Sequence, residues 1–266
     1  MKPAFHDHFS AVAQRYANCR PQYPAALFEY LASVAPKGEM VWDCAAGTGQ
    51  ATVGLARVFG SIVATDASAE QIAQAKSQAG IEYRVATAEQ SGLADASVGL
   101  VTVAQALHWF DLDHFYAEVR RVLRPGGLLA VWAYGVHRVG EDAIDRLIMD
   151  FYSTIVGPYW PPERVLVEQG YRTIPFPFAE ISPPVFQMET FWTLDQLMGY
   201  FGTWSATQRY ITARGESPLG ALEESLRAVW GGATRERRIT WPLALRLGRV
   251  DGSRRDQGGD IFHRDA

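Results

Sequence analysis

The chain has 266 residues, enough for one large domain or for a medium-sized domain carrying an insertion, with a sizeable buried core. Hydrophobic residues make up 48% and charged residues 20% of the sequence, which is typical of a globular protein and argues against a disordered or fibrous chain. With 25 basic and 29 acidic side chains the formal net charge is −4, so no nucleic-acid partner is expected. The two cysteines, Cys19 and Cys44, can form neither a disulfide framework nor a four-ligand zinc site, and no metal is expected.

The sequence carries no signal for a membrane or for export. The N-terminal residues include proline, two histidines and an aspartate where a secretory signal has its apolar stretch. The longest apolar run near the centre, residues 128–134, is far shorter than the roughly 20 residues of a membrane-spanning helix. We therefore expect a cytoplasmic protein without a membrane partner, and the sequence leaves its oligomeric state open.

Apolar runs typical of strands alternate with helical periodicity over residues 39–134. The expected strands are 39–45, 61–66, 81–87, 98–106 and 128–134. The expected helices are 48–59, 67–79 and one that begins near residues 111–113 and ends with Arg124, before Pro125-Gly126-Gly127. This alternation predicts an α/β protein with a doubly wound, mostly parallel sheet and helices on both faces.

The flanking regions differ from this pattern. Residues 1–36 are expected to form an N-terminal helical extension, and residues 37–250 the main domain, with a final strand over 239–250. Aromatic residues occupy thirteen of the 54 positions in 151–204, against 12% for the whole chain, which predicts an aromatic-rich cap or insert over about 140–205. The polar, glycine-rich tail 251–266 is expected to be disordered.

The loops that follow the first two strands suggest a nucleoside site. Ligands of an open parallel sheet bind beyond the carboxyl ends of its strands. After the first strand, Gly47 and Gly49 allow a sharp turn and a close approach of the backbone to a ligand. Asp66, nineteen residues after Gly47, ends the second strand, where a carboxylate accepts hydrogen bonds from a ribose diol.

These loops fit either a nicotinamide dinucleotide or S-adenosylmethionine, and two residues favour the second. The dinucleotide motif needs Gly or Ala at the position that Thr52 occupies. Asp43 at the end of the first strand would repel a pyrophosphate but suits a ligand with a sulfonium and an ammonium group.

Five sequence segments together resemble a known family. They are VWDCAAGTGQAT, VATDAS, ATAEQSGL, VAQALHWFD and RVLRPGGLLAVW, in this order. The chain resembles the class I S-adenosylmethionine-dependent methyltransferases, and within them the type 11 group that includes trans-aconitate methyltransferase-like enzymes. YANCRPQYP and TWPLALRLGRV extend the resemblance over roughly residues 5–250.

The resemblance implies a Rossmann-like seven-stranded sheet with one antiparallel strand, and S-adenosyl-L-methionine as cofactor with S-adenosyl-L-homocysteine as product. Two positions depart from the family pattern, since Ala45 stands where the first loop glycine is usual and Thr87 where an aspartate often binds adenine. The adenine contact is left open between Ala88 and Glu89. The implied cofactor-binding residues are Asp43, Ala45, Gly47, Thr48, Gly49, Gln50, Asp66, Ala88, Glu89, Ala104 and Gln105.

The acceptor side of the reaction is less defined by sequence. His108 is either a catalytic base or substrate ligand, or a hydrogen-bonded structural residue. Tyr16, Arg20 and Tyr23 are candidates for contact with a substrate or cofactor carboxylate, the alternative being a surface helix and turn. Tyr159, Trp160, Trp192 and Trp204 either form the core of the cap or face the substrate and the sulfonium.

The sequence therefore predicts methyl transfer from S-adenosylmethionine to a small molecule, with a carboxylic acid favoured over an amine. Two alternatives remain at this point. One is a non-catalytic protein that binds the cofactor, and the other is a nicotinamide-dependent oxidoreductase, which Asp43 and Thr52 disfavour.

Overall fold

The computed structural model describes residues 21–232 and 234–250, and contacts between their Cα atoms divide the chain into two compact units. The sheet unit comprises residues 25–134, 169–186 and 243–250, and the aromatic unit comprises residues 21–24, 135–168, 187–232 and 234–242. No helix within these described ranges is long and apolar enough to cross a membrane.

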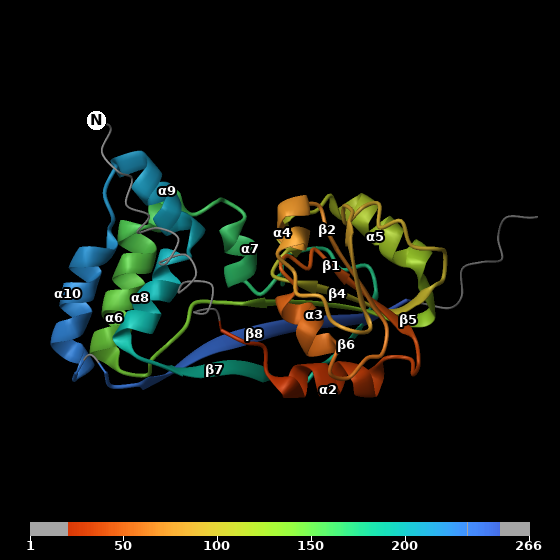
Figure 1. The fold of residues 1–266 in the computed structure, drawn as a ribbon, viewed down its shortest axis with the longest axis horizontal. Coiled ribbons are helices and arrows are strands. Elements are labelled where there is room, and N and C mark those ends of the chain that lie inside the picture. Colours follow the sequence, from red (N-terminus) through yellow and green to blue (C-terminus); the bar gives the residue numbers. More distant parts are fainter. Residues whose placement is uncertain (1–20, 233, 251–266) are drawn as a thin grey trace, which may run out of the picture. The chain divides into compact units, whose positions relative to one another are not determined.

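The sheet unit is built on parallel strands in the order β3-β2-β1-β4-β5 (Figure 1). Their bounds are β1 Met40–Cys44, β2 Ile62–Asp66, β3 Ile81–Val85, β4 Val98–Ala104 and β5 Leu123–Tyr134. β4 is buried along nearly its whole length, as its almost unbroken apolar sequence predicts for a central parallel strand. The predicted strands and the doubly wound order are thus confirmed.

The sheet of the described residues has eight strands, one more than the seven that the family resemblance implied. β8 (Arg237–Arg249) runs antiparallel to β5, and β6 (Ala179–Ile181) runs antiparallel to β8. β7 (Phe186–Trp192) also pairs with β8. The thirteen-residue length of β8 gives it enough backbone donors and acceptors to pair with all three neighbours.

Helices cover both faces of the sheet, as the opposite orientation of neighbouring side chains in β1 shows. Trp42 is fully buried, and its ring contacts Phe115 of α5 (Leu112–Val122). Asp43, the next residue, points to the other face and is hydrogen-bonded to Thr52 of α3 (Gln50–Leu55). Successive strand residues face opposite sides of a sheet, so α3 and α5 pack on opposite faces.

Three further helices complete the sheet unit. α2 (Ala25–Val34) buries Leu27, Phe28 and Leu31, and a side chain at Gly54 of α3 would collide with the Phe28 ring. The close packing of α2 on α3 therefore depends on that glycine. The remaining helices are α4 (Ala69–Ala73) and the 3₁₀ turn η1 (Leu107–Trp109).

The expected end of the third helix at Arg124 is wrong. α5 ends at Val122, and Leu123 already has the extended backbone of β5, with φ −71° and ψ 137°. A residue that precedes proline is disfavoured in the helical region, so Pro125 prevents Arg124 from continuing the helix. Arg124 instead forms an ion pair with Glu39 of the same unit.

The aromatic unit is mainly helical and includes most of β7 and the first part of β8. Its helices are α6 Asp142–Asp150, η2 Phe151–Ile155, η3 Gly157–Tyr159, α7 Arg164–Glu168, α8 Leu194–Gly202, α9 Ser205–Arg214 and α10 Leu219–Trp230. α10 ends at Trp230, and its last carbonyl accepts two hydrogen bonds from the buried guanidinium of Arg237 in β8, which also pairs with Glu141. A cation at the carboxyl end of a helix satisfies the last carbonyl groups.

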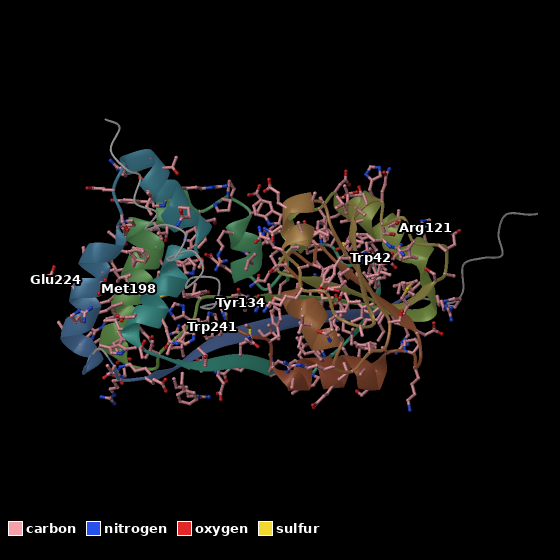
Figure 2. All side chains as sticks on the ribbon, viewed as in Figure 1. Trp42, Arg121, Tyr134, Met198, Glu224 and Trp241 are labelled. Atoms are coloured by element: carbon pink, nitrogen blue, oxygen red, sulfur yellow. The ribbon has the colours of Figure 1, made fainter. Side chains whose placement is uncertain are left out.

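The core of the aromatic unit is a continuous set of ring contacts. Trp204 touches the rings of Phe151, Tyr152, Trp160, Tyr200 and Phe201, and Trp192 touches those of Tyr200 and Trp241. Figure 2 shows Trp241 and Met198 among the side chains of this unit. The interpretation of Trp192 and Trp204 as core residues is supported, since 6% and 8% of their surfaces are exposed.

Some sequence predictions fall outside the described residues. These are the N-terminal part of the expected helical extension, with Tyr16 and Arg20, and the expected disordered tail from Asp251 onward. The domain limits at residues 36 and 250, and those of the cap at about 140 and 205, stay predictions.

Candidate cofactor and acceptor site

The loop after β1 has the backbone geometry of a close-approach turn. Ala45, Gly47 and Gly49 all have left-handed backbone conformations, with φ of 54°, 59° and 89°. Glycine adopts this conformation without steric cost, whereas alanine does not. A side chain at Gly49 would also collide with the hydroxyl of Tyr83 in β3. The loop therefore depends on both glycines, and Ala45 holds a strained conformation.

Asp43 lies beneath this loop and is completely buried. Its carboxylate accepts hydrogen bonds from the hydroxyls of Thr52 in α3, at 2.5 Å, and Thr102 in β4, at 2.8 Å. Burial raises the pKa of Asp43 to about 6, although the two threonine hydrogen bonds act in the opposite direction. Asp43 thus joins β1, β4 and α3 under the loop, and its role toward a cofactor stays a prediction.

Asp66 connects the end of β2 to the glycine loop. Its two carboxylate oxygens accept the backbone N–H groups of Gly47, at 2.8 Å, and of Ser68, at 2.9 Å. Each carboxylate oxygen has a second lone pair, and Asp66 is only partly buried. The structure therefore brings Asp66 and Gly47 together, as their placement after adjacent strands predicts.

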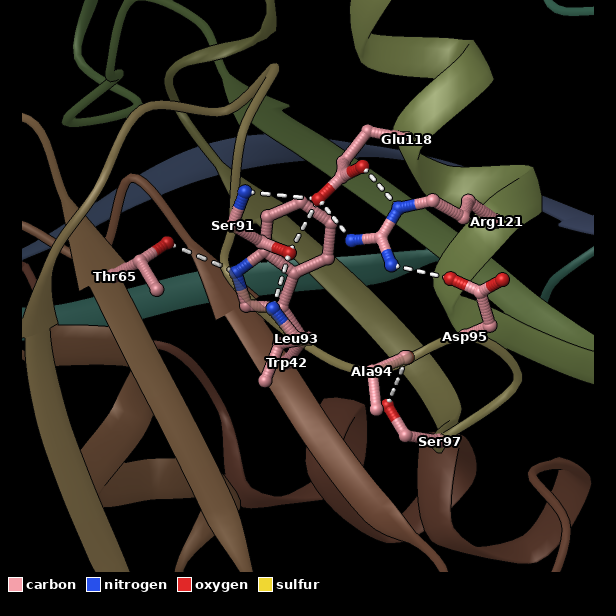
Figure 3. A network of polar contacts seen from close by, with 9 residues as sticks. All are labelled: Trp42, Thr65, Ser91, Leu93, Ala94, Asp95, Ser97, Glu118 and Arg121. Atoms are coloured by element: carbon pink, nitrogen blue, oxygen red, sulfur yellow. Dashed lines mark hydrogen bonds and ion pairs between the residues drawn. The ribbon is translucent and has the colours of Figure 1, made fainter.

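The loop after β3 is anchored by a buried carboxylate of α5 (Figure 3). Glu118 Oε1 accepts hydrogen bonds from the backbone N–H and the hydroxyl of Ser91, at 2.9 and 2.5 Å. Arg121 donates to both oxygens of Glu118 and to Asp95. Burial raises the pKa of Glu118, but the hydrogen bonds from Arg121 and Ser91 outweigh it and hold the pKa below its ordinary value.

This network fixes the segment that contains the two adenine-binding candidates. Ala88 is buried, whereas Glu89 is half-buried and accepts a 3.2 Å hydrogen bond from the backbone N–H of Asp111, the residue that precedes α5. The two residues thus remain distinct candidates.

The parallel strands all end at one edge of the sheet, where the loops after β1, β2 and β3 also lie. At the end of β4 this edge carries a second residue with a strained backbone, in addition to Ala45. Gln105 follows Ala104 directly and has φ 60°, which is uncommon for a residue with a side chain. Its backbone N–H donates to the carbonyl of Trp132, and its side-chain amide to that of Tyr134. Strained backbone of this kind is concentrated at binding sites.

His108 lies on η1, just beyond β4, and is held by a tyrosine from a distant segment. Its Nδ1 is 2.9 Å from the hydroxyl of Tyr171, which is fully buried and has φ 60°. The His108 ring is also close to that of Trp109, with centroids 4.6 Å apart, and Trp109 is 57% exposed. The alternative of a hydrogen-bonded structural histidine is therefore supported in part, and a direct role stays a prediction.

Arg246 in β8 fixes the segment that carries Tyr171. Its guanidinium donates to the carbonyls of Tyr171 and Ile174, at 2.8 and 2.6 Å, and pairs with Glu180 at 2.6 Å. It also stacks over the Phe176 ring, 4.5 Å from its centroid. These contacts hold Tyr171 in its left-handed conformation.

The remaining predicted residues belong to the loop after β1, to the start of α3, to the aromatic unit or to the part of the chain outside the described residues. Thr48 and Gln50 lie on the loop and at the start of α3, where Thr48 is exposed and Gln50 half-buried. Tyr23 belongs to the aromatic unit, and Tyr16 and Arg20 lie outside the described residues. Within residues 21–232 and 234–250, no three histidine, cysteine or acidic side chains are grouped to hold a metal ion.

Four residues that shape this edge were not predicted from the sequence: Tyr83, Ser91, Glu118 and Tyr171. For Glu118 the sequence does contain a signal, because this acidic residue falls on the apolar face of α5. A carboxylate at a buried position needs a hydrogen-bond donor as partner, and Ser91 is that donor. No local sequence pattern predicts the position of Tyr171, because its partner His108 is 63 residues earlier in the chain.

Comparisons with known proteins show the family to which this chain belongs. A family model described as a methyltransferase domain matches residues 42–131. A Dictyostelium discoideum protein named as a methyltransferase is 33% identical over 225 residues, covering 84% of this chain and 86% of that protein. This chain is a class I S-adenosylmethionine-dependent methyltransferase. A Schizosaccharomyces pombe protein, named as an uncharacterized methyltransferase, is 33% identical over 222 residues, covering 80% of this chain and 85% of that protein.

A solved structure supports the fold of this methyltransferase. It comes from Anaeromyxobacter dehalogenans, is described as a type II methyltransferase, and is 46% identical with a TM-score of 0.83. The similarity covers 87% of this chain and 98% of that one. Family membership implies S-adenosylmethionine as the methyl donor, and it makes the oxidoreductase alternative untenable.

Proposed function

We propose that this methyltransferase binds S-adenosylmethionine along the loops after β1 to β4 and methylates a small carboxylic acid, as a trans-aconitate methyltransferase-like enzyme would. The observation that carries the cofactor site is the Asp66 carboxylate, held at the sheet edge by the N–H groups of Gly47 and Ser68. A carboxylate fixed in this way accepts hydrogen bonds from a ribose diol without reorganising.

The other residues of the edge fit the remaining parts of the cofactor. In this proposal the adenine lies against Ala88 or Glu89, and the methionine part against Thr48, Gln50, Ala104 and Gln105. Asp43 contributes indirectly, because it is buried and positions the loop through Thr52 and Thr102. The same residues would hold the product S-adenosylhomocysteine.

Bound S-adenosylmethionine supplies a methyl group that its sulfonium sulfur already makes electrophilic. The protein therefore has to align the acceptor with that methyl group and exclude water. A carboxylate acceptor is ionised at neutral pH and needs no base, whereas a hydroxyl or ammonium group must lose a proton.

The carboxylate preference rests on sequence. Arg20 offers a planar set of donors that matches a carboxylate, and Tyr16 and Tyr23 can complete its hydrogen bonding. The resemblance to trans-aconitate methyltransferase-like enzymes favours the same acceptor class.

A screen of methyl acceptors tests the proposal. The purified protein is incubated with S-adenosylmethionine and polycarboxylates, fatty acids, phenols or amines, and S-adenosylhomocysteine formation is measured. We expect turnover with at least one carboxylate, and a large loss with Arg20→Ala but not with Arg57→Ala, which removes an exposed arginine of the sheet unit. Turnover only with amines or phenols, undiminished in the Arg20 variant, would contradict the carboxylate proposal.

A further inference from the structure

His137 is a buried histidine in the core of the aromatic unit. The segment that carries it, residues 135–138, pairs with β8 through its backbone, since Arg138 and Thr240 exchange two hydrogen bonds of 2.9 Å. Only 2% of the surface of His137 is exposed. Among the described residues of the aromatic unit, His137 is the only histidine. A group that titrates in the mildly acidic range is therefore fixed inside this unit.

Four aromatic rings surround the imidazole of His137. Those of Tyr200 and Phe201 come from α8, that of Trp204 directly precedes α9, and that of Trp241 belongs to β8. Within the part of the chain that the structure describes, neither imidazole nitrogen has a hydrogen-bond partner. A buried donor or acceptor without a partner destabilises the folded state, and an imidazolium ion in the same place costs more.

The elements around His137 offer no counter-charge for a protonated ring among the described residues. Tyr200 presents an uncharged hydroxyl, which accepts a hydrogen bond from Nε1 of Trp241 at 3.2 Å. Arg237, on the same face of β8 as Trp241, is a cation paired with Glu141. The other charged side chains of these elements within the aromatic unit are exposed: Arg138, Asp195, Arg209, Arg214 and Arg238. Burial therefore lowers the pKa of His137 to about 3.

We propose that His137 is an acid-sensitive switch of the aromatic unit, whose protonation at mildly acidic pH separates α8 and α9 from residues 135–138 and β8 while the sheet unit stays folded. In a locally opened form the imidazole meets water and regains its ordinary pKa near 6.5. The open form then binds a proton that the closed form excludes. The stability of the closed form is fully present above about pH 6.5 and is lost progressively as the pH falls below it. This switch does not depend on the identity of the methyl acceptor.

Three titratable groups of the sheet unit do not weaken it in the same pH range. The pKa of Asp43 is raised to about 6, so its contribution to stability increases as the pH falls through that value. The pKa of His114 is raised by Asp111, so its contribution is also present at the lower pH. Glu118, whose pKa is lowered, loses its contribution only below the ordinary glutamate value of 4.5. These groups favour the folded sheet unit where His137 weakens the aromatic unit.

Hydrogen exchange of the full chain, followed by mass spectrometry, tests the switch. Exchange at about pH 7.5 and about pH 5 is corrected for the intrinsic effect of pH, and peptides of α8 and α9 are compared with peptides of β1 and β4. We expect the opening equilibrium of α8 and α9 to rise about 30-fold at the lower pH, the factor for one histidine that binds a proton only in the open form. We expect β1 and β4 to keep their protection, and an equal loss in both units would overturn the inference.

Two substitutions of His137 remove its titration. His137→Phe keeps a ring at this position, and His137→Leu introduces a smaller apolar side chain. In each variant that folds at about pH 7.5, we expect the 30-fold effect of pH on α8 and α9 to disappear. His114→Gln, which changes an exposed histidine of the sheet unit, is the matched control and should retain the effect. If α8 and α9 respond to pH equally without His137, the inference fails.

Nitrogen NMR tests the same property in the wild-type protein, without any substitution. In ¹⁵N-histidine-labelled protein we expect the ring of His137 to remain neutral in the folded state down to the pH at which α8 and α9 open, whereas the exposed His114 becomes protonated. A His137 ring that titrates near pH 6.5 while α8 and α9 stay protected would overturn the inference, because protonation would then not be coupled to opening.

Discussion

The backbone N–H of Gly47 donates to the carboxylate of Asp66, nineteen residues later in the chain, at 2.8 Å. This bond joins the glycine loop after β1 to the end of β2, so the two parts of the proposed cofactor site are positioned by each other. A change at Asp66 should therefore affect the loop as well as the ribose contact.

Asp66→Asn should weaken S-adenosylmethionine binding by roughly 10- to 150-fold, because hydrogen bonds to a charged group contribute about 1.5–3 kcal/mol. Isothermal titration calorimetry measures the dissociation constant. Asp113→Asn, which changes an exposed carboxylate in the first turn of α5, is the matched control and should leave it unchanged. An unaltered dissociation constant in a folded Asp66 variant would exclude this residue from the site.

Ala45→Gly should stabilise the protein by up to about 1 kcal/mol, because Ala45 has φ 54° and an L-residue in the left-handed region is strained by roughly 1–2 kcal/mol. Chemical denaturation measures the free energy of unfolding. Ala46→Gly is the control, because Ala46 is not among the described residues with positive φ, and it should lose about 0.5–1 kcal/mol. Equal effects of the two substitutions would disagree with the loop geometry.

Asp43→Asn should become more stable relative to the wild type as the pH rises. The pKa of Asp43 is raised from 3.8 to about 6, so its stability contribution is fully present below about pH 4 and is lost as the pH rises through 6. Asparagine does not titrate, so the variant does not lose stability in this pH range. The unfolding free energy of the variant minus that of the wild type should therefore grow by up to about 3 kcal/mol between pH 4 and pH 8. Denaturation curves at several pH values measure it, and a difference independent of pH would refute the raised pKa.

Glu118→Gln should destabilise the protein by about 1.5–3 kcal/mol at neutral pH and weaken cofactor binding, because Glu118 anchors the loop that carries Ala88 and Glu89. The pKa of Glu118 is lowered, so its contribution is present above the ordinary glutamate pKa and is lost as the pH falls through the lower value.

The control for the Glu118 variant is Asp95→Asn, which removes an exposed partner of the same arginine. It should change the unfolding free energy by less than about 1 kcal/mol. Thermal and chemical denaturation compare the two, and an Asp95 effect as large as that of Glu118 would argue against Glu118 as the anchor.

The sequence predicted the sheet because its strands are short apolar runs between helical segments, a local pattern. It also placed Gly47 and Asp66 at one edge, since the carboxyl ends of adjacent parallel strands meet there. The burial of Asp43 was not predictable in this way. It depends on Thr52 and Thr102, nine and 59 residues later in the chain, whose hydroxyls face it only once the sheet has formed.

The same physical reason applies to His108. Its position after β4 follows from the strand pattern, but its partner Tyr171 comes from a segment whose placement depends on Arg246 of β8. Aromatic residues in 151–204 indicated a packed cluster without showing which rings would meet. The contact between His108 and Tyr171 and the ring contacts of the aromatic cluster both depend on segments far apart in the chain, which local periodicity does not predict.

The central claim is that this edge of the sheet binds S-adenosylmethionine, and calorimetric titration of the purified protein with S-adenosylmethionine, S-adenosylhomocysteine and NAD tests it most directly. We expect saturable binding of both S-adenosyl compounds at one site and none of NAD. Heat of binding from NAD alone would contradict it.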